Sequence, residues 1–129
     1  MKVWIDDIRD APDDSWTEVR KVQPAIEFIS RYWVEIDEIS FDHDIENRPD
    51  DETFRPIAHY VGVRYEGMRN RGKPCPKLTI HSINPTGAIH IQDILSRYGL
   101  KSERKPYAPD LERMKREFGT GDLMDGEVK

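Results

Sequence analysis

Short apolar runs alternate along the chain with amphipathic segments. Three runs have the length and composition of buried strands: Lys2 to Ile5, Glu38 to Phe41 and Lys77 to His81. After each run, apolar residues recur at spacings of three and four, which is the helical period. This pattern predicts helices over about 24–33, 54–68 and 88–98.

The order of these elements favours an α/β fold. Strands that alternate with helices form a parallel sheet, and the right-handed connections between them place the helices on its faces. We therefore expect one three-layer domain over residues 1–118, with a central, mainly parallel sheet and helices on both faces. A weak strand within 15–22 and a short helix over 109–118 stay open, and residues 119–129 are expected to be a flexible polar tail.

A polar cluster follows each predicted strand. Asp6-Asp7 follows the first, Asp42-His43-Asp44 follows the second, and the polar segment 82–87 follows the third. In open parallel sheets, ligands bind beyond the carboxyl ends of the strands. We therefore expect the three clusters to share one crevice.

The acidic residues of these clusters predict a divalent metal site. Neighbouring carboxylates repel one another, and burial raises the cost of ionising them. A bound Mg²⁺ or Mn²⁺ ion would relieve both effects, because these ions prefer carboxylate oxygens and water. The candidate ligands are Asp6, Asp7, Asp42 and Asp44. The alternative is that these side chains cap turns and face solvent.

Two histidines at the same edge indicate phosphoester chemistry. His43 and His81, with Asp42, are the catalytic candidates. One histidine would activate a water or hydroxyl, and the other would protonate the leaving oxygen. This pairing requires both rings to face a common, phosphate-sized gap on the same side of the sheet.

Small and basic residues near the strand ends are candidates for binding phosphate. The start of the third helix presents backbone N–H groups, which attract anions. Its polar residues are equally suited to capping the helix, and the two roles are compatible. The candidate phosphate ligands are Arg9, Ser82, Asn84, Thr86 and Gly87. For Arg9 two alternatives stay open, an ion pair with Asp7 and a plain position after the turn.

Composition narrows the possible partners. The chain has 129 residues and a net charge of -5, with a net of -9 in residues 1–56 and +4 in residues 57–129. An acidic average disfavours broad coating of DNA, although a bound divalent ion would let an anionic ligand approach. No apolar run is long enough for a membrane span, and the acidic N-terminus is unlike a signal peptide, so we expect a cytoplasmic protein. A single cysteine, Cys75, excludes an internal disulfide and a multi-thiolate metal site.

Three motifs follow one another over about residues 1–98. They are V-W-I-D-D-I-R-D-A-P at 3–12, I-S-F-D-H-D at 39–44 and I-H-S-I-N-P-T-G at 80–87. Together they make the chain resemble the cyclic-phosphate processing receiver-like domains of bacteria and phages, a derivative of the response-regulator receiver fold. The resemblance implies a receiver-like α/β core and an association with RNA repair and conflict systems. It also implies one pocket formed by Asp6, Asp7, Asp42, His43, Asp44, His81, Ser82 and Asn84.

The sequence departs from the pattern of ordinary signalling receivers. Such receivers have an acidic pair after strand one, a phosphoacceptor Asp after strand three, a Ser or Thr after strand four and a Lys after strand five. Asp6-Asp7 matches the pair and Ser82 is a candidate for the Ser/Thr position. No clear fifth strand ends in Lys, and two histidines are added, which favours hydrolysis over phosphoryl signalling.

The leading hypothesis is a metal-dependent phosphoesterase (a hydrolase) that processes cyclic phosphates on RNA ends or small nucleotides. The alternative is a non-enzymatic receiver-like module that binds a phosphorylated ligand or a protein partner. A third hypothesis is a phage-encoded protein that sequesters nucleotides or acts as an inhibitor.

Overall fold

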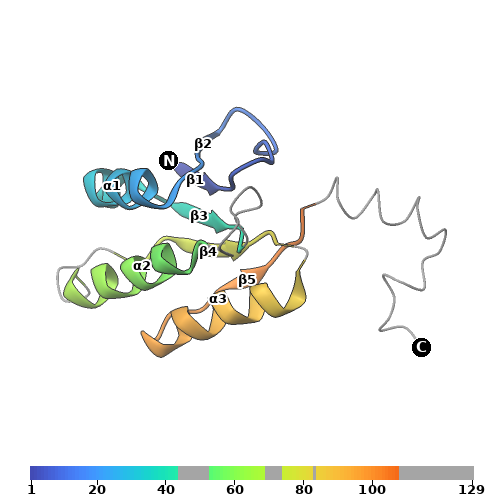
Figure 1. Cartoon of the computed structure of the whole chain (residues 1–129). Helices are drawn as coiled ribbons and strands as arrows, with labels where there is room; N and C mark the ends of the chain where they lie inside the picture. The colour runs from blue at the N-terminus through green and yellow to red at the C-terminus, as the bar shows by residue number, and fades with distance from the viewer. Residues whose placement is uncertain (44–52, 69–73, 83, 108–129) are drawn as a thin grey trace.

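A five-stranded parallel sheet forms the centre of the molecule (Figure 1). The structure, a computed structural model, describes residues 1–43, 53–68, 74–82 and 84–107. The sheet has the spatial order β2-β1-β3-β4-β5, and all neighbouring strands are parallel. Its strands are β1 (Lys2–Ile5), β2 (Trp16–Val19), β3 (Glu38–Phe41), β4 (Lys77–Ile80) and β5 (Glu103–Arg104).

Three helices lie side by side in one layer (Figure 1). They are α1 (Val22–Tyr32), which continues into the short 3-10 helix η1 (Trp33–Glu35), α2 (Arg55–Met68) and α3 (Pro85–Arg97). The connections from β2 to β3, β3 to β4 and β4 to β5 all advance in the same direction across the sheet. Because such connections are right-handed, their helices lie on the same face.

The two faces of the sheet differ in chemistry, since successive side chains of a strand point to opposite faces. One set of alternate residues joins the helices in the hydrophobic core, among them Val3, Ile39 and Leu78. The residues that follow them, Trp4, Ser40 and Thr79, are paired across the three strands and are also buried. We call the face that carries Trp4, Ser40 and Thr79 the polar face.

The receiver-like α/β fold with a parallel sheet is confirmed, but the described helices cover one face, whereas we expected helices on both. The reason lies in the connection from β1 to β2. This connection runs opposite to the others, so a helix there would cover the polar face. Residues 6–15 form no helix, because Pro12 and several carboxylates interrupt any apolar period.

The sequence pattern located most elements within a few residues. Strands 2–5 and 38–41 are confirmed, and β2 lies within the segment 15–22, where the sequence allows a weak strand. Helix α3 begins at Pro85, not near residue 88, because Asn84 caps it and proline suits a first helical turn. No helix in the described part of the chain is long and apolar enough to cross a membrane.

The expectation of no fifth strand ending at a lysine was wrong. Strand β5 consists of Glu103 and Arg104, and Lys105 follows it directly. A strand of two residues is too short to produce an alternating pattern. The predicted helix over 109–118, the polar tail over 119–129 and the end of the domain at 118 lie outside the described residues.

The contact between α2 and α3 gives a prediction about stability. A Cβ atom on Gly62 of α2 would lie 2.1 Å from the ring of Tyr98. We expect Gly62→Ala to lower the free energy of unfolding by about 1–3 kcal/mol, because the ring must move. In Gly67→Ala, on the same helix, the added atom has nothing within 4 Å. This variant should raise the free energy of unfolding by up to about 1 kcal/mol, because alanine favours the helix. Urea denaturation of the two variants tests this, and equal effects would contradict it.

Candidate functional site

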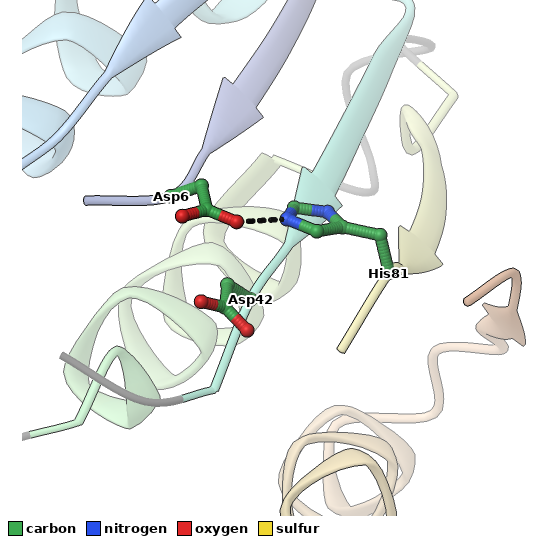
Figure 2. Close-up of side chains that lie close together, drawn as sticks. All are labelled: Asp6, Asp42 and His81. Carbon is green, nitrogen blue, oxygen red and sulfur yellow. Dashed lines mark hydrogen bonds and ion pairs between the residues drawn. The ribbon is translucent and has the colours of Figure 1, made fainter. Parts of the chain in front are cut away.

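Three buried side chains lie close together just beyond the carboxyl ends of β1, β3 and β4, and Figure 2 shows Asp6 and His81 facing each other with Asp42 beside them. They are Asp6, Asp42 and His81, and we call them the central cluster. One ligand atom of each residue lies within 4.8 Å of the others. Their exposed fractions are 0%, 3% and 2%. A cluster of two carboxylates and one imidazole with this spacing could hold a metal ion.

The register of the sheet brings these three residues together. Ile5 is paired with Phe41, and Phe41 with Ile80, so the next residue of each strand lies at the same edge. The backbone bonding continues for one residue past the strands: the Asp42 N–H donates to Ile5 O and the His81 N–H donates to Phe41 O, both at 2.9 Å. Alternation then directs all three side chains to the polar face.

The His81 ring is fixed on three sides. Its Nε2 lies 2.9 Å from Asp6 Oδ2, and its Nδ1 lies 2.8 Å from the Ser40 hydroxyl (the first contact is dashed in Figure 2). The indole of Trp4 stacks on the imidazole with ring centroids 3.7 Å apart and an interplanar angle of 8°. Both ring nitrogens therefore have partners, and the orientation of the ring is determined.

Asp6 is held as a carboxylate. Burial raises its pKa, but the hydrogen bond with His81 and those from the backbone N–H groups of Arg9 and Ile8 lower it more. The two backbone bonds reach Oδ1 at 2.9 and 3.0 Å. The pKa of Asp6 is therefore below the usual 3.8, and its charge is present at neutral pH.

Arg9 brings a positive charge to both carboxylates. Its Nη1 lies 3.8 Å from Asp6 Oδ2 and 3.7 Å from Asp42 Oδ2. The backbone of Arg9 is held as well, because Trp4 Nε1 donates to its carbonyl oxygen at 3.0 Å. A residue that the sequence suggested as a phosphate ligand thus lies at the central cluster.

His43 has different surroundings from His81. Its ring lies against α3, since a Cβ atom on Gly87 would come within 2.5 Å of it. The ring of His90, also on α3, is 5.7 Å away between centroids. His81 instead stacks on Trp4 at the polar face. The two rings therefore do not share one environment, and we do not retain the proposal that they act as an acid–base pair.

The loop between β4 and α3 is stabilised by local hydrogen bonds. The Gly87 N–H donates to Asn84 Oδ1 at 3.2 Å, and the Asn84 N–H donates to Ser82 Oγ at 3.1 Å. Asn84 therefore caps α3, while Thr86 is exposed. A role for Ser82, Asn84, Thr86 and Gly87 in binding phosphate stays a prediction.

Asp7 and Asp44 complete the residues singled out from the sequence. Asp7 is half-buried and is not a member of the central cluster, and Asp44 lies outside the described residues. A metal role for either stays a prediction. The sequence argument missed Ser40, although a serine two residues before Asp42 in an apolar strand should point to the same face.

The fold and the central cluster define a receiver-like α/β domain with a buried carboxylate–imidazole site. The family model of the cyclic-phosphate processing receiver domain matches residues 1–97. The chain therefore belongs to this family, and the match spans all three members of the central cluster. Comparisons with curated proteins and with solved structures found no match.

The lowered pKa of Asp6 predicts a pH-dependent contribution to stability. We expect Asp6→Asn to reduce the free energy of unfolding at pH 7 by about 3 kcal/mol, as breaking a buried ion pair does. A depressed pKa stabilises the fold above about pH 4, and this contribution is lost as the pH falls through the folded-state value. The difference between the two proteins should therefore shrink below pH 4, as measured by urea denaturation at several pH values.

An exposed aspartate on α3 provides the control for this experiment. Asp93→Asn should change the free energy of unfolding by no more than about 0.5 kcal/mol at any of these pH values. If the effect of Asp6→Asn is as small as that of Asp93→Asn at pH 7, the charge of Asp6 does not stabilise the fold.

Proposed function

We propose that this protein is a metal-dependent phosphoesterase that processes cyclic phosphates on RNA ends or small nucleotides. The observation that carries the proposal is the buried central cluster of Asp6, Asp42 and His81 at the carboxyl edge of a parallel sheet. Membership of the cyclic-phosphate processing receiver family supports the substrate class. The cytoplasmic location expected from the sequence would give the protein access to both kinds of substrate.

The donor set of the central cluster fits Mg²⁺ or Mn²⁺. Two carboxylates supply the hard oxygen ligands that both ions prefer, and Mn²⁺ also accepts an imidazole. The close approach of the ligand atoms, within 4.8 Å of one another, supports a shared ion. When bound, the ion would orient a substrate phosphate and offset its negative charge.

Arg9 and His43 are our candidates for acting on the substrate itself. The side chain of Arg9 is 19% exposed beside the central cluster, so we expect it to be accessible to a phosphate. His43 is adjacent to Asp42 in the chain, and its backbone N–H donates to Asp42 Oδ1 at 2.8 Å. We assign to His43 the proton transfer to or from the substrate, and we keep His81 as a ligand of the ion in the central cluster.

Hydrolysis of 2′,3′-cyclic nucleotides tests the proposal. We expect turnover in the presence of Mg²⁺ or Mn²⁺ and its loss in a chelator. Asp42→Asn and His81→Ala should each reduce kcat/KM by about 100-fold or more, because each removes a metal ligand. His43→Ala should reduce kcat by about 100-fold with little change in metal affinity, as expected for a lost acid or base.

His59→Ala is the matched control, since His59 lies on α2 and contacts Tyr98 through its Nδ1. This variant should keep the wild-type rate within about two-fold, as a surface substitution away from a site does. Absence of turnover in the wild type with either metal, or full activity in Asp42→Asn, would refute the phosphoesterase.

One observation favours a second candidate function. Lys105 directly follows β5, so a lysine stands where an ordinary signalling receiver has one. A non-enzymatic receiver-like module would use this edge of the sheet to take a phosphoryl group on Asp42 and bind a protein partner. Labelling by acetyl phosphate that is lost in Asp42→Asn would support this function, whereas tight nucleotide binding with neither turnover nor labelling would support nucleotide sequestration.

A further inference from the structure

A positively charged side chain already lies beside the two carboxylates that would hold a metal ion. Arg9 Nη1 is 3.8 Å from Asp6 Oδ2 and 3.7 Å from Asp42 Oδ2, so one nitrogen is shared between both groups. Asp6 follows β1 and Asp42 follows β3, and Arg9 belongs, like Asp6, to the connection between β1 and β2. The guanidinium therefore joins the same two groups that a divalent ion would join.

Hydrogen bonds of its backbone N–H and carbonyl groups fix the position of Arg9. Its N–H donates to Asp6 Oδ1 at 2.9 Å, which closes a tight turn after β1. Its carbonyl oxygen accepts from Trp4 Nε1 at 3.0 Å and from Arg20 Nη1 at 3.3 Å. Arg20 also donates to the Asp6 carbonyl oxygen at 3.3 Å. These hydrogen bonds fix the backbone at the start of the connection, so that the side chain of Arg9 lies next to the central cluster.

Charge makes the guanidinium and a divalent ion competitors. Both are attracted to the same carboxylate oxygens, and they repel one another at a separation of a few ångströms in a buried site. A phosphate offers the guanidinium an alternative partner, because its oxygens match the planar fork of an arginine. With 19% of its side chain exposed, Arg9 has access to a phosphate arriving from solvent.

From this geometry we propose that Arg9 is the resident counter-ion of the site, competing with divalent metal for Asp6 and Asp42. The guanidinium leaves the carboxylates to a metal ion when a phosphate draws it away, so phosphate and metal bind with positive coupling. This inference rests on the metal site of the proposed function and adds to it an order of events, in which the phosphate-bearing substrate promotes loading of the metal.

The dissociation constant of Mn²⁺, measured by electron paramagnetic resonance with and without inorganic phosphate, tests the competition. Arg9→Gln removes the charge and should bind Mn²⁺ about ten-fold more tightly than the wild type, within the usual range of coupling between sites. Arg9→Lys keeps the charge and should stay close to the wild type. Phosphate should tighten Mn²⁺ binding by a larger factor in the wild type than in Arg9→Gln.

Arg97→Gln is the matched control, because it makes the same change at an exposed position in the last turn of α3. It should leave Mn²⁺ affinity unchanged. Far-UV circular dichroism verifies that each variant is folded. If Arg9→Gln unfolds, the wild type still tests the proposal, because inorganic phosphate that fails to tighten its Mn²⁺ binding would overturn it. Equal Mn²⁺ affinity in Arg9→Gln and the wild type, or in Arg9→Gln and Arg9→Lys, would overturn the proposal.

The outcome is separable from that of the phosphoesterase. Tighter Mn²⁺ binding by Arg9→Gln without hydrolysis of 2′,3′-cyclic nucleotides by the wild type would support the competition and reject the enzyme. Hydrolysis by the wild type with unchanged Mn²⁺ affinity in Arg9→Gln would support the enzyme and reject the competition.

Discussion

The structure around the strand ends depends on the burial of two carboxylates, Asp6 and Asp42, at one edge of the sheet. Removing an ionised carboxylate from water costs several kcal/mol unless positive charge and hydrogen bonds replace the lost hydration. The neighbours of Asp6 supply both: His81 and two backbone N–H groups bond it, and Arg9 brings a charge to both acids. A site that concentrates negative charge in this way is suited to a divalent ion. In the absence of that ion, another positive charge must stabilise the two carboxylates.

The connection from β1 to β2 links the fold to this requirement. In a doubly wound sheet a helix would occupy this connection, but here residues 6–15 form a loop. Its first residues turn back over the end of β1. There Asp6 accepts hydrogen bonds from two backbone N–H groups, and Trp4 donates one to the carbonyl oxygen of Arg9. The missing helix leaves the polar face without a helical cover from this segment, and the loop instead delivers an arginine to the carboxylates.

The sequence predicted what depends on local pattern and missed what depends on side-chain direction. Asp6 and Asp42 were identified because each follows an apolar run, and His81 because it ends one; parallel pairing brings such positions to the same edge of the sheet. His43 was grouped with His81 because it is next to Asp42 in the chain, but consecutive residues diverge, and His43 lies against Gly87 of α3. Strand β5 was missed because two residues carry no period, and the contact of Arg9 with both acids depends on how a loop folds, which spacing does not reveal.

The surroundings of His81 suit a metal ligand better than a group that moves protons. A general acid or base must reach its substrate and change its bonding during the reaction. His81 is 2% exposed, is stacked on Trp4, and has partners at both nitrogens in Ser40 and Asp6. Metal-binding histidines are oriented in the same way, by a hydrogen bond to the ring nitrogen that does not bind the metal. In His81, Ser40 bonds Nδ1, and Nε2 points to the carboxylate of Asp6. A fixed His81 therefore belongs with Asp6 and Asp42 in the central cluster.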